Sequence, residues 1–257
     1  MRQRLSAVPA ALTGSPSVCP GKGCATQGGA PSFCDLCLVK HLAVCSALDG
    51  SEINAMEQAA GQVELTAGQT LAREGDRRQY VFTVTKGALR LVRLLADGRR
   101  QVVGFAMPGD YVGFSDAPIY RNQIEAVTQT VVCRFEVQRM RALCDQFPAL
   151  EHKLFERACA ELDSAHESML ALARMNPVEK LADFVVKLFN QSVRLGNTTT
   201  TVLLPMSRGD IADHLGLTVE TVSRSFTKLR RQNLIALPDV NRVQILDLPG
   251  LEALVGG

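Results

Sequence analysis

The stretch MSRGDIADHLGLTVETVSRSFTKLRRQNLI, residues 206–235, decides how the C-terminal part of this 257-residue chain folds. Ser207 can cap a helix, because Asp210 follows three residues later as in a capping box, and Gly216 then supplies a turn. Thr218 can cap a second helix, whose apolar face we expect to comprise Val219 or Val222, Phe226 and Leu229. Two helices joined by a short glycine-containing turn are typical of the helix-turn-helix. The two apolar runs of LIALPDVNRVQILDL, residues 234–248, predict a hairpin wing after it.

Positive charge is concentrated on the second of these helices. From Thr218 to Asn233 there are four basic residues and one acidic residue, a net charge of 4 − 1 = +3, whereas the whole chain carries a net charge of only +2. The first residues of a recognition helix read base edges. Glu220 and Arg224 lie one turn apart, and could read one G·C pair together or form a surface ion pair in the free protein. The residues expected to contact double-stranded DNA are Arg208, Thr218, Val219, Glu220, Thr221, Ser223, Arg224 and Lys228.

The pattern changes from strand-like to helix-like near residue 147. The composition, 46% hydrophobic and 21% charged, suits a globular protein with a sizeable core. From about Gly61 to Val137, short Val- and Thr-rich runs separated by turn signals predict an antiparallel β-roll or barrel. We therefore predict an α+β fold: a flexible tail over 1–33, a cysteine loop with a β-roll over 34–147, a long helix over 148–176, and a winged helix-turn-helix over 177–257.

An apolar stripe follows the predicted long helix. Its members are spaced alternately three and four residues apart: Phe155, Ala158, Leu162, Ala165, Met169 and Leu172. Such a seam either packs on the helix's own β-domain or joins two subunits in a coiled coil. Because the stripe is narrow and long, we favour a homodimer interface. Asn176-Pro177 should end the helix, since a residue before proline disfavours the helical conformation.

The order of β-roll, long helix, GDIADHLGLTVETVSR and wing resembles the CRP/FNR superfamily of bacterial transcription regulators over about residues 34–250. The stretch TVETVSR is similar to the FNR/FixK branch, in which the residues of E-x-x-S-R contact a TTGAT…ATCAA inverted repeat. The resemblance implies a cyclic-nucleotide-binding-like roll and base contacts by Glu220, Ser223 and Arg224. It also implies a dimerisation helix, a homodimer, and RNA polymerase as a partner.

Three of the eight cysteines lie in CDLCLVKHLAVC, at Cys34, Cys37 and Cys45. No export signal and no long apolar run is evident, so we expect the cytoplasm, where clustered cysteines indicate metal, redox or catalytic chemistry. The resemblance to FNR-type regulators supplies a fourth ligand, Cys133 in TQTVVCRFEV, and implies an oxygen-sensing [4Fe–4S] cluster. Zinc is one alternative, and no metal, with Cys133 a small buried hydrophobe, is the other.

The other cysteines and the histidines carry weaker signals. Cys19 and Cys24 fall in the predicted tail and are left unassigned, whereas Cys144 and Cys159 fall in helical segments and should be packing residues. The four histidines, at 41, 152, 166 and 214, show no metal or triad spacing and should be surface residues.

Other functions are less compatible with the sequence. Cyclic-nucleotide receptors of the superfamily hold the phosphate with Gly-Glu and Arg-Ser or Arg-Thr pairs, but Gly113-Phe114 and Gln123-Ile124 stand at the matching places. We therefore expect no cyclic nucleotide. An electron-transfer enzyme is disfavoured by the DNA-reading helix and by the lack of a nucleotide or flavin loop. A FixK-type regulator without a cluster, controlled by abundance or thiol oxidation, remains the main alternative.

Overall fold

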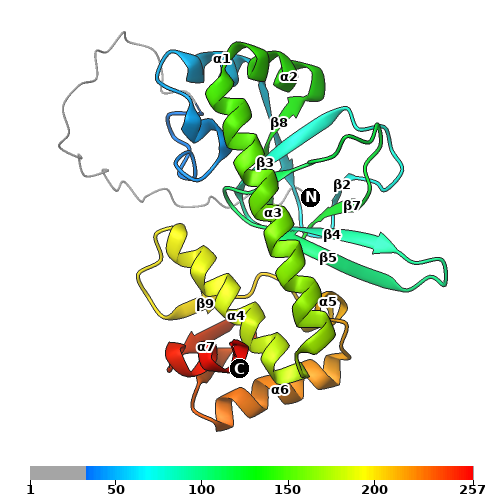
Figure 1. The fold of residues 1–257 in the computed structure, drawn as a ribbon, viewed down its shortest axis with the longest axis vertical. Coiled ribbons are helices and arrows are strands. Elements are labelled where there is room, and N and C mark those ends of the chain that lie inside the picture. Colours follow the sequence, from blue (N-terminus) through cyan, green and yellow to red (C-terminus); the bar gives the residue numbers. More distant parts are fainter. Residues whose placement is uncertain (1–32, 257) are drawn as a thin grey trace, which may run out of the picture. The chain divides into compact units, whose positions relative to one another are not determined.

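The computed structural model describes residues 33–256 (Figure 1). Apart from Phe33, the predicted tail lies outside the described residues, and so do Cys19 and Cys24. The described part has the predicted α+β fold, with a roll of antiparallel sheets, a long helix and a winged helix-turn-helix. None of its helices combines the length and the apolar character needed to cross a membrane.

Two four-stranded antiparallel sheets form the roll. The first has the order β1 (Ala60–Leu65), β8 (Thr130–Glu136), β3 (Tyr80–Lys86) and β6 (Tyr111–Val112). The second has the order β2 (Thr70–Ala72), β7 (Gln123–Ala126), β4 (Leu89–Leu94) and β5 (Arg100–Ala106). Apolar side chains from both sheets share one core, in which Val84, Leu89 and Val132 are fully buried. The alternation along these strands is why the sequence pattern predicted them.

Three short helices that the sequence analysis did not predict pack beside the roll. The short 3-10 helix η1 (Val44–Ala47) precedes α1 (Glu52–Ala59), and α2 (Val137–Gln146) follows β8 directly. Their buried residues, including Met56 and Met140, form a second apolar cluster that contains Cys133. Cys34 and Cys45 pack against the same cluster, so the cysteine loop is attached to the roll.

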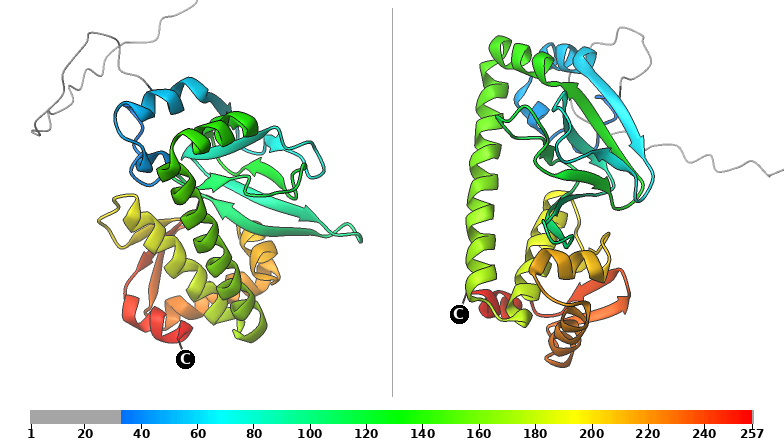
Figure 2. Two further views of the ribbon diagram at one scale, coloured as in Figure 1. Left: turned by 45° about the horizontal axis from the view of Figure 1, so that its top comes forward. Right: turned by 90° about the vertical axis from the view of Figure 1, so that its right-hand side faces the viewer.

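The long helix α3 (Pro148–Arg174) extends from the roll to the C-terminal helices (Figures 1 and 2). It ends before Asn176, as predicted. The Asn176 side chain accepts hydrogen bonds from the amides of Val178 and Glu179, and Glu179 completes a capping box that starts α4 (Pro177–Arg194). The Asn-Pro pair thus separates two helices by a sharp, well-capped turn.

The C-terminal part contains the predicted helix-turn-helix, α5 (Arg208–Leu215) and α6 (Val219–Arg231). Ser207 and Asp210 form the predicted capping box, and Gly216 adopts the left-handed conformation at the turn, with φ of 65°. The predicted hairpin is β10 (Ile235–Asp239) and β11 (Arg242–Ile245). Two elements were not predicted, namely β9 (Thr201–Leu203), which adds a third strand, and α7 (Leu248–Val255).

Candidate nucleic-acid interface and cysteine site

The first turns of α6 present a polar face to solvent. Thr218 caps the helix by accepting a hydrogen bond from the Thr221 amide at 3.2 Å. The apolar side of α6 begins at Val222, whereas Val219 is 44% exposed, which resolves the alternative that the sequence left open. The exposed side chains that follow the cap are Val219, Glu220, Ser223, Arg224 and, one turn further, Lys228. The side chains predicted to read base edges therefore share one exposed face of the helix.

Glu220 and Arg224 influence each other without a direct ion pair. The pKa of Glu220 is lowered by hydrogen bonds from its own backbone amide and from Thr218, and further by the charge of Arg224. Among the ion pairs of residues 33–256, none joins these two side chains. Both groups consequently remain available to an external partner, an acceptor on Glu220 and a fork of donors on Arg224.

Arg208 joins the helix-turn-helix to the wing. Its guanidinium carbon lies 3.4 Å from the ring centroid of Phe226, on α6, and its Nη2 donates to the carbonyl of Val240, in the wing turn, at 3.5 Å. Its Nη1 is buried without a hydrogen-bond partner among the described residues, and burial lowers the pKa of the group. The expected DNA contact of Arg208 stays a prediction. In the free chain this residue holds the wing against α6.

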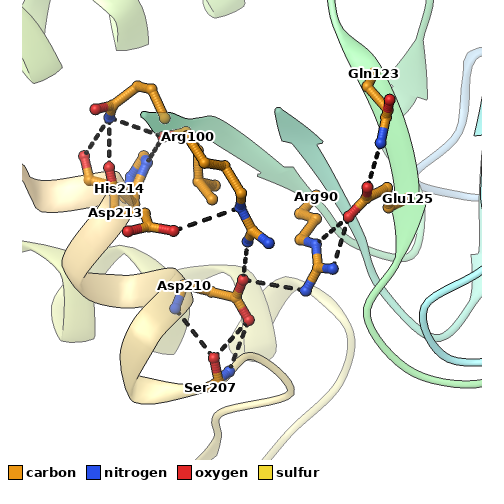
Figure 3. Close-up of polar contacts among 10 residues, drawn as sticks. Arg90, Arg100, Gln123, Glu125, Ser207, Asp210, Asp213 and His214 are labelled. Carbon is orange, nitrogen blue, oxygen red and sulfur yellow. Dashed lines mark hydrogen bonds and ion pairs between the residues drawn. The ribbon is translucent and has the colours of Figure 1, made fainter. Parts of the chain in front are cut away.

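A polar network joins the roll to the first helix of the helix-turn-helix (Figure 3). The Asp210 carboxylate accepts from the Ser207 amide and hydroxyl at 3.1 and 2.7 Å, which completes the cap of α5. Its other oxygen accepts from Arg90, on β4, at 3.1 Å, and from Arg100, on β5. Arg90 also pairs with Glu125, on β7, at 2.6 Å. One buried carboxylate thus serves both a helix cap and the contact between two parts of the chain.

The charges around Asp210 outweigh the cost of burying it. Burial by itself would raise its pKa, but the hydrogen bonds from Ser207 and the charges of Arg90 and Arg100 lower it overall. Asp210 is therefore ionised in the folded protein at neutral pH. Sequence reasoning found Asp210 only as a capping residue, because both arginines lie more than a hundred residues away in the chain.

His214 is part of the same contact, and its predicted surface position is wrong. Its ring nitrogen Nδ1 lies 3.1 Å from the carbonyl of Val102, on β5. Its ring packs against Phe105, on β5, and Phe184, on α4, at centroid distances of 5.3 and 5.7 Å. Burial is the main reason why its pKa is lowered, so the imidazole is neutral at pH 7. Beside it, the Gln101 amide donates to the carbonyl of Asp213.

A cavity of about 480 Å³ lies beneath the cysteine loop, and all four predicted ligands, Cys34, Cys37, Cys45 and Cys133, line it. Cys34 and Cys37 come from the loop before η1, Cys45 lies in η1, and Cys133 comes from the central strand β8. Strands on both sides fix β8, so one wall of the cavity is rigid and the other is a short loop.

The four sulfur atoms are close enough to influence one another electrostatically. Burial raises the pKa of Cys133 to about 12, with further contributions from Cys37, Cys34 and Cys45. Burial, Glu57 and two of the other cysteines raise the pKa of Cys34 to about 12. Within residues 33–256, however, no three Cys, His, Asp or Glu side chains form a ready-made metal site. The donor chemistry fits a thiolate-bound metal, and the loop would have to close on it.

The cysteine loop contacts the start of the long helix. Arg157, on α3, donates to the carbonyl of Leu42, which lies between Cys37 and Cys45. Leu42 also lies close to Gly109, whose φ is 93°, since a Cβ on Gly109 would lie 2.8 Å from the Leu42 Cβ. The next residue, Asp110, accepts a hydrogen bond from Gln191, on α4, at 2.9 Å. The loop therefore contacts α3 directly. It also lies against Gly109, and the next residue, Asp110, contacts α4.

The predicted seam of α3 is exposed in a single chain. Phe155, Leu162, Met169 and Leu172 are 66, 57, 65 and 47% exposed. Ala165 is also exposed and Ala158 is half-buried. The alternative that this stripe packs on the chain's own β-domain is therefore wrong for most of its length. Only Leu150 and Ala171 of this helix are buried.

The two remaining described cysteines differ from each other. Cys144, on α2, packs against the apolar cluster around Cys133, as expected of a packing residue. Cys159, on α3, is exposed, so its predicted packing role is wrong. The sequence analysis assigned Cys159 a packing role only because it falls in a helical segment, and most residues of α3 are exposed in a single chain.

Comparison with known proteins matches both parts of the chain. Residues 62–147 match the family model described as a cyclic nucleotide-binding domain. Residues 179–254 match the Crp-like helix-turn-helix domain. The solved structure of FixK2 from Bradyrhizobium japonicum is similar to this fold with a TM-score of 0.71 and 30% identity, over 76% of this chain and 96% of that one.

Curated relatives agree with this match over nearly their whole lengths. The nitrogen fixation regulation protein FixK of Bradyrhizobium diazoefficiens is 39% identical, over 86% of this chain and 93% of the relative. The transcriptional activatory protein AadR of Rhodopseudomonas palustris is 36% identical, over 93 and 95%. The transcriptional activator protein FnrL of Cereibacter sphaeroides is 34% identical, over 85 and 90%. The chain belongs to the CRP/FNR family of DNA-binding transcription regulators and is not an enzyme.

Proposed function

We propose that this regulator responds to oxygen or redox state through a [4Fe–4S] cluster held by Cys34, Cys37, Cys45 and Cys133. The observation that carries the proposal is the shared cavity, which all four thiols line although 88 residues separate Cys45 from Cys133. Thiolates are the usual ligands of iron–sulfur clusters, and binding of the cluster releases the thiol protons. In such a site the cluster supplies the oxygen-labile redox centre.

The loop's contacts suggest how the state of the cysteines would reach the DNA-binding helices. With all four cysteines engaged, the loop is drawn towards β8 and Leu42 stays beneath Arg157. If the loop is released, Arg157 loses its carbonyl acceptor, and the turn at Gly109 loses the side chain packed against it. Both changes act on α3 and on the Asp110–Gln191 contact, so ordering of the loop is linked to the geometry of the helices that bind DNA.

For DNA we propose a homodimer on an inverted repeat similar to TTGAT…ATCAA, with Glu220, Ser223 and Arg224 as the base-reading residues. The exposed stripe of α3 supports the dimer, because an apolar surface of this length in water favours a partner. The exposed face at the start of α6 supports the base contacts. We further propose RNA polymerase as a protein partner, activation in the cytoplasm, and no cyclic-nucleotide ligand.

The test is purification without oxygen, followed by iron and sulfide counts and titration of a fluorescent inverted-repeat duplex. Wild-type protein should carry about four irons per chain, as a single cube requires, and should lose specific binding on exposure to air. Cys37→Ser and Cys133→Ser should lose most of the iron. Cys144→Ser is the matched control and should keep it, because this thiol belongs to the neighbouring apolar cluster and does not line the cavity.

The second candidate is a FixK-type regulator without a cluster. It is favoured by the relatives named FixK and by the lack of a ready-made metal site within residues 33–256. Wild-type protein that contains no iron after anaerobic purification, and that binds the duplex equally well in air, would establish this alternative and contradict the cluster.

A further inference from the structure

The fourth proposed ligand has two cross-strand neighbours. Cys133 is directly opposite Gln62, on β1, and opposite Thr83, on β3. Side chains of directly opposed residues project from the same face of a sheet, with Cβ atoms about 4.5–5.5 Å apart. All three line the cysteine cavity. Gln62 is exposed at the edge of the sheet, whereas Thr83 is only 4% exposed, so Thr83 is the deep polar neighbour of Cys133.

The hydroxyl of Thr83 is buried and has no hydrogen-bond partner among the described residues. This is unusual, because a buried polar group without a partner destabilises the fold. Valine has the same shape and would fill the position without that cost, and β3 already has valine two residues before Thr83, at Val81, and directly after it, at Val84. The hydroxyl therefore indicates an acceptor that is absent from the chain alone.

A second threonine on the same strand provides a contrast. Thr85 also lines the cavity, two residues along β3, but its hydroxyl donates to the carbonyl of Val131 at 3.0 Å. Its donor is occupied within the fold. The Thr85 hydroxyl is thus already hydrogen-bonded within the fold, whereas the Thr83 hydroxyl could still donate to a ligand.

We propose that Thr83 is a positioning residue that donates a hydrogen bond to a sulfide of the proposed cluster, beside Cys133. The inference rests on the proposed cluster and identifies a residue that sets its properties. Hydrogen bonds to the sulfur atoms stabilise the more negatively charged, reduced state and raise the reduction potential. Thr83 therefore makes the bound cluster harder to oxidise, and so sets how readily the protein responds to oxygen.

The test compares Thr83→Val, Thr83→Ser and Thr85→Val with wild-type protein, all purified without oxygen. Three quantities are measured: iron and sulfide per chain, the midpoint potential of the one-electron couple, and the rate at which visible absorption is lost in air-saturated buffer. Thr83→Val should keep its iron, shift the midpoint to a more negative potential, and lose its absorption several-fold faster. Thr83→Ser, which keeps a hydroxyl, and Thr85→Val should match wild type.

Separate results would overturn separate claims. If wild-type protein carries no iron, both the cluster and the role of Thr83 are wrong. If wild-type protein is loaded and Thr83→Val has the same potential and decay rate, only the role of Thr83 is wrong. If Thr83→Val fails to load, recovery of the iron in Thr83→Ser supports the hydroxyl contact, and failure of both variants overturns it. Metal-free Thr83→Val should resist urea at least as well as metal-free wild type.

Discussion

Removing the carboxylate of Asp210 should show how firmly the roll holds the helix-turn-helix. Asp210→Ala removes the Asp210 half of the capping box that starts α5, and loss of a capping side chain costs about 0.5–2 kcal/mol of unfolding free energy. It also leaves Arg90 and Arg100 without their shared acceptor. Loss of one member of a fully buried pair costs about 3–5 kcal/mol, but the Arg100 side chain is 34% exposed and that of Arg90 18%. We therefore take roughly 1–2 kcal/mol for the ion pairs, and expect a total of about 1.5–4 kcal/mol.

Urea unfolding followed by circular dichroism at pH 7.5 measures this loss of stability. The comparison holds if the variant and wild type have the same slope of unfolding free energy against urea concentration. Ser207→Ala is the matched control for the cap, because it removes one capping partner and keeps Asp210 beside both arginines. Asp213→Ala controls for the surface charge near Arg100, since its pair at 3.4 Å is 38% exposed on the acid. A double-mutant cycle between Asp210→Ala and Arg100→Ala should give a coupling of about 1 kcal/mol or more. A coupling near zero, with Asp210→Ala no worse than Ser207→Ala, would refute the reasoning.

Three further predictions test the other contacts. Arg224→Ala should cost about 1–3 kcal/mol per half-site on specific DNA, measured by fluorescence anisotropy, and an equal loss on scrambled DNA would make it a phosphate contact. Leu162→Glu should give monomers in sedimentation equilibrium because it buries a charge in the seam, whereas a tight dimer would contradict the seam. Burial lowers the pKa of His214 in the folded chain below the usual histidine value of about 6.5. The neutral imidazole therefore contributes its full stability to the fold above about pH 6.5, and this contribution is lost as the pH falls through the lowered pKa. His214→Gln should flatten the urea midpoint between pH 7.5 and 5.5, and an unchanged slope would contradict this.

The sequence predicted those elements whose signals are local. The caps at Ser207 and Thr218, the turn at Gly216 and the apolar face of α6 all lie within one short stretch, so the helix-turn-helix followed from residue spacing. The helices α1 and α2 were missed because each is at most 10 residues long and neither has a side-chain cap. The strand β9 was missed because its three residues gain their partners only from β11, far along the chain.

For the candidate sites, too, residue spacing predicted some features, and others depend on how distant segments pack. The exposed face of α6 could be predicted, since helical spacing fixes which side chains share a side. The pairing of Cys133 with a distant loop came from family resemblance, and no spacing in the sequence relates the two. The contacts of Asp210 and the unpaired hydroxyl of Thr83 depend on strand register and on the packing of separate segments. Such features become visible only in the folded chain.

The aromatic contact around His214 bears on any attempt to study the DNA-binding part in isolation. Phe105, Met107 and Val127 belong to the roll, yet they pack against the apolar core of the C-terminal helices. A fragment that starts at Pro177 would therefore expose this face of the core to water, together with the ring of Phe184 that Phe105 contacts at 6.1 Å. Such a fragment should aggregate, or gain solubility only after these positions are made polar. The buried residues of this core all lie between Leu181 and Leu251, so a cut at Asn176 leaves the core whole but removes the side chains of the roll that cover one of its faces.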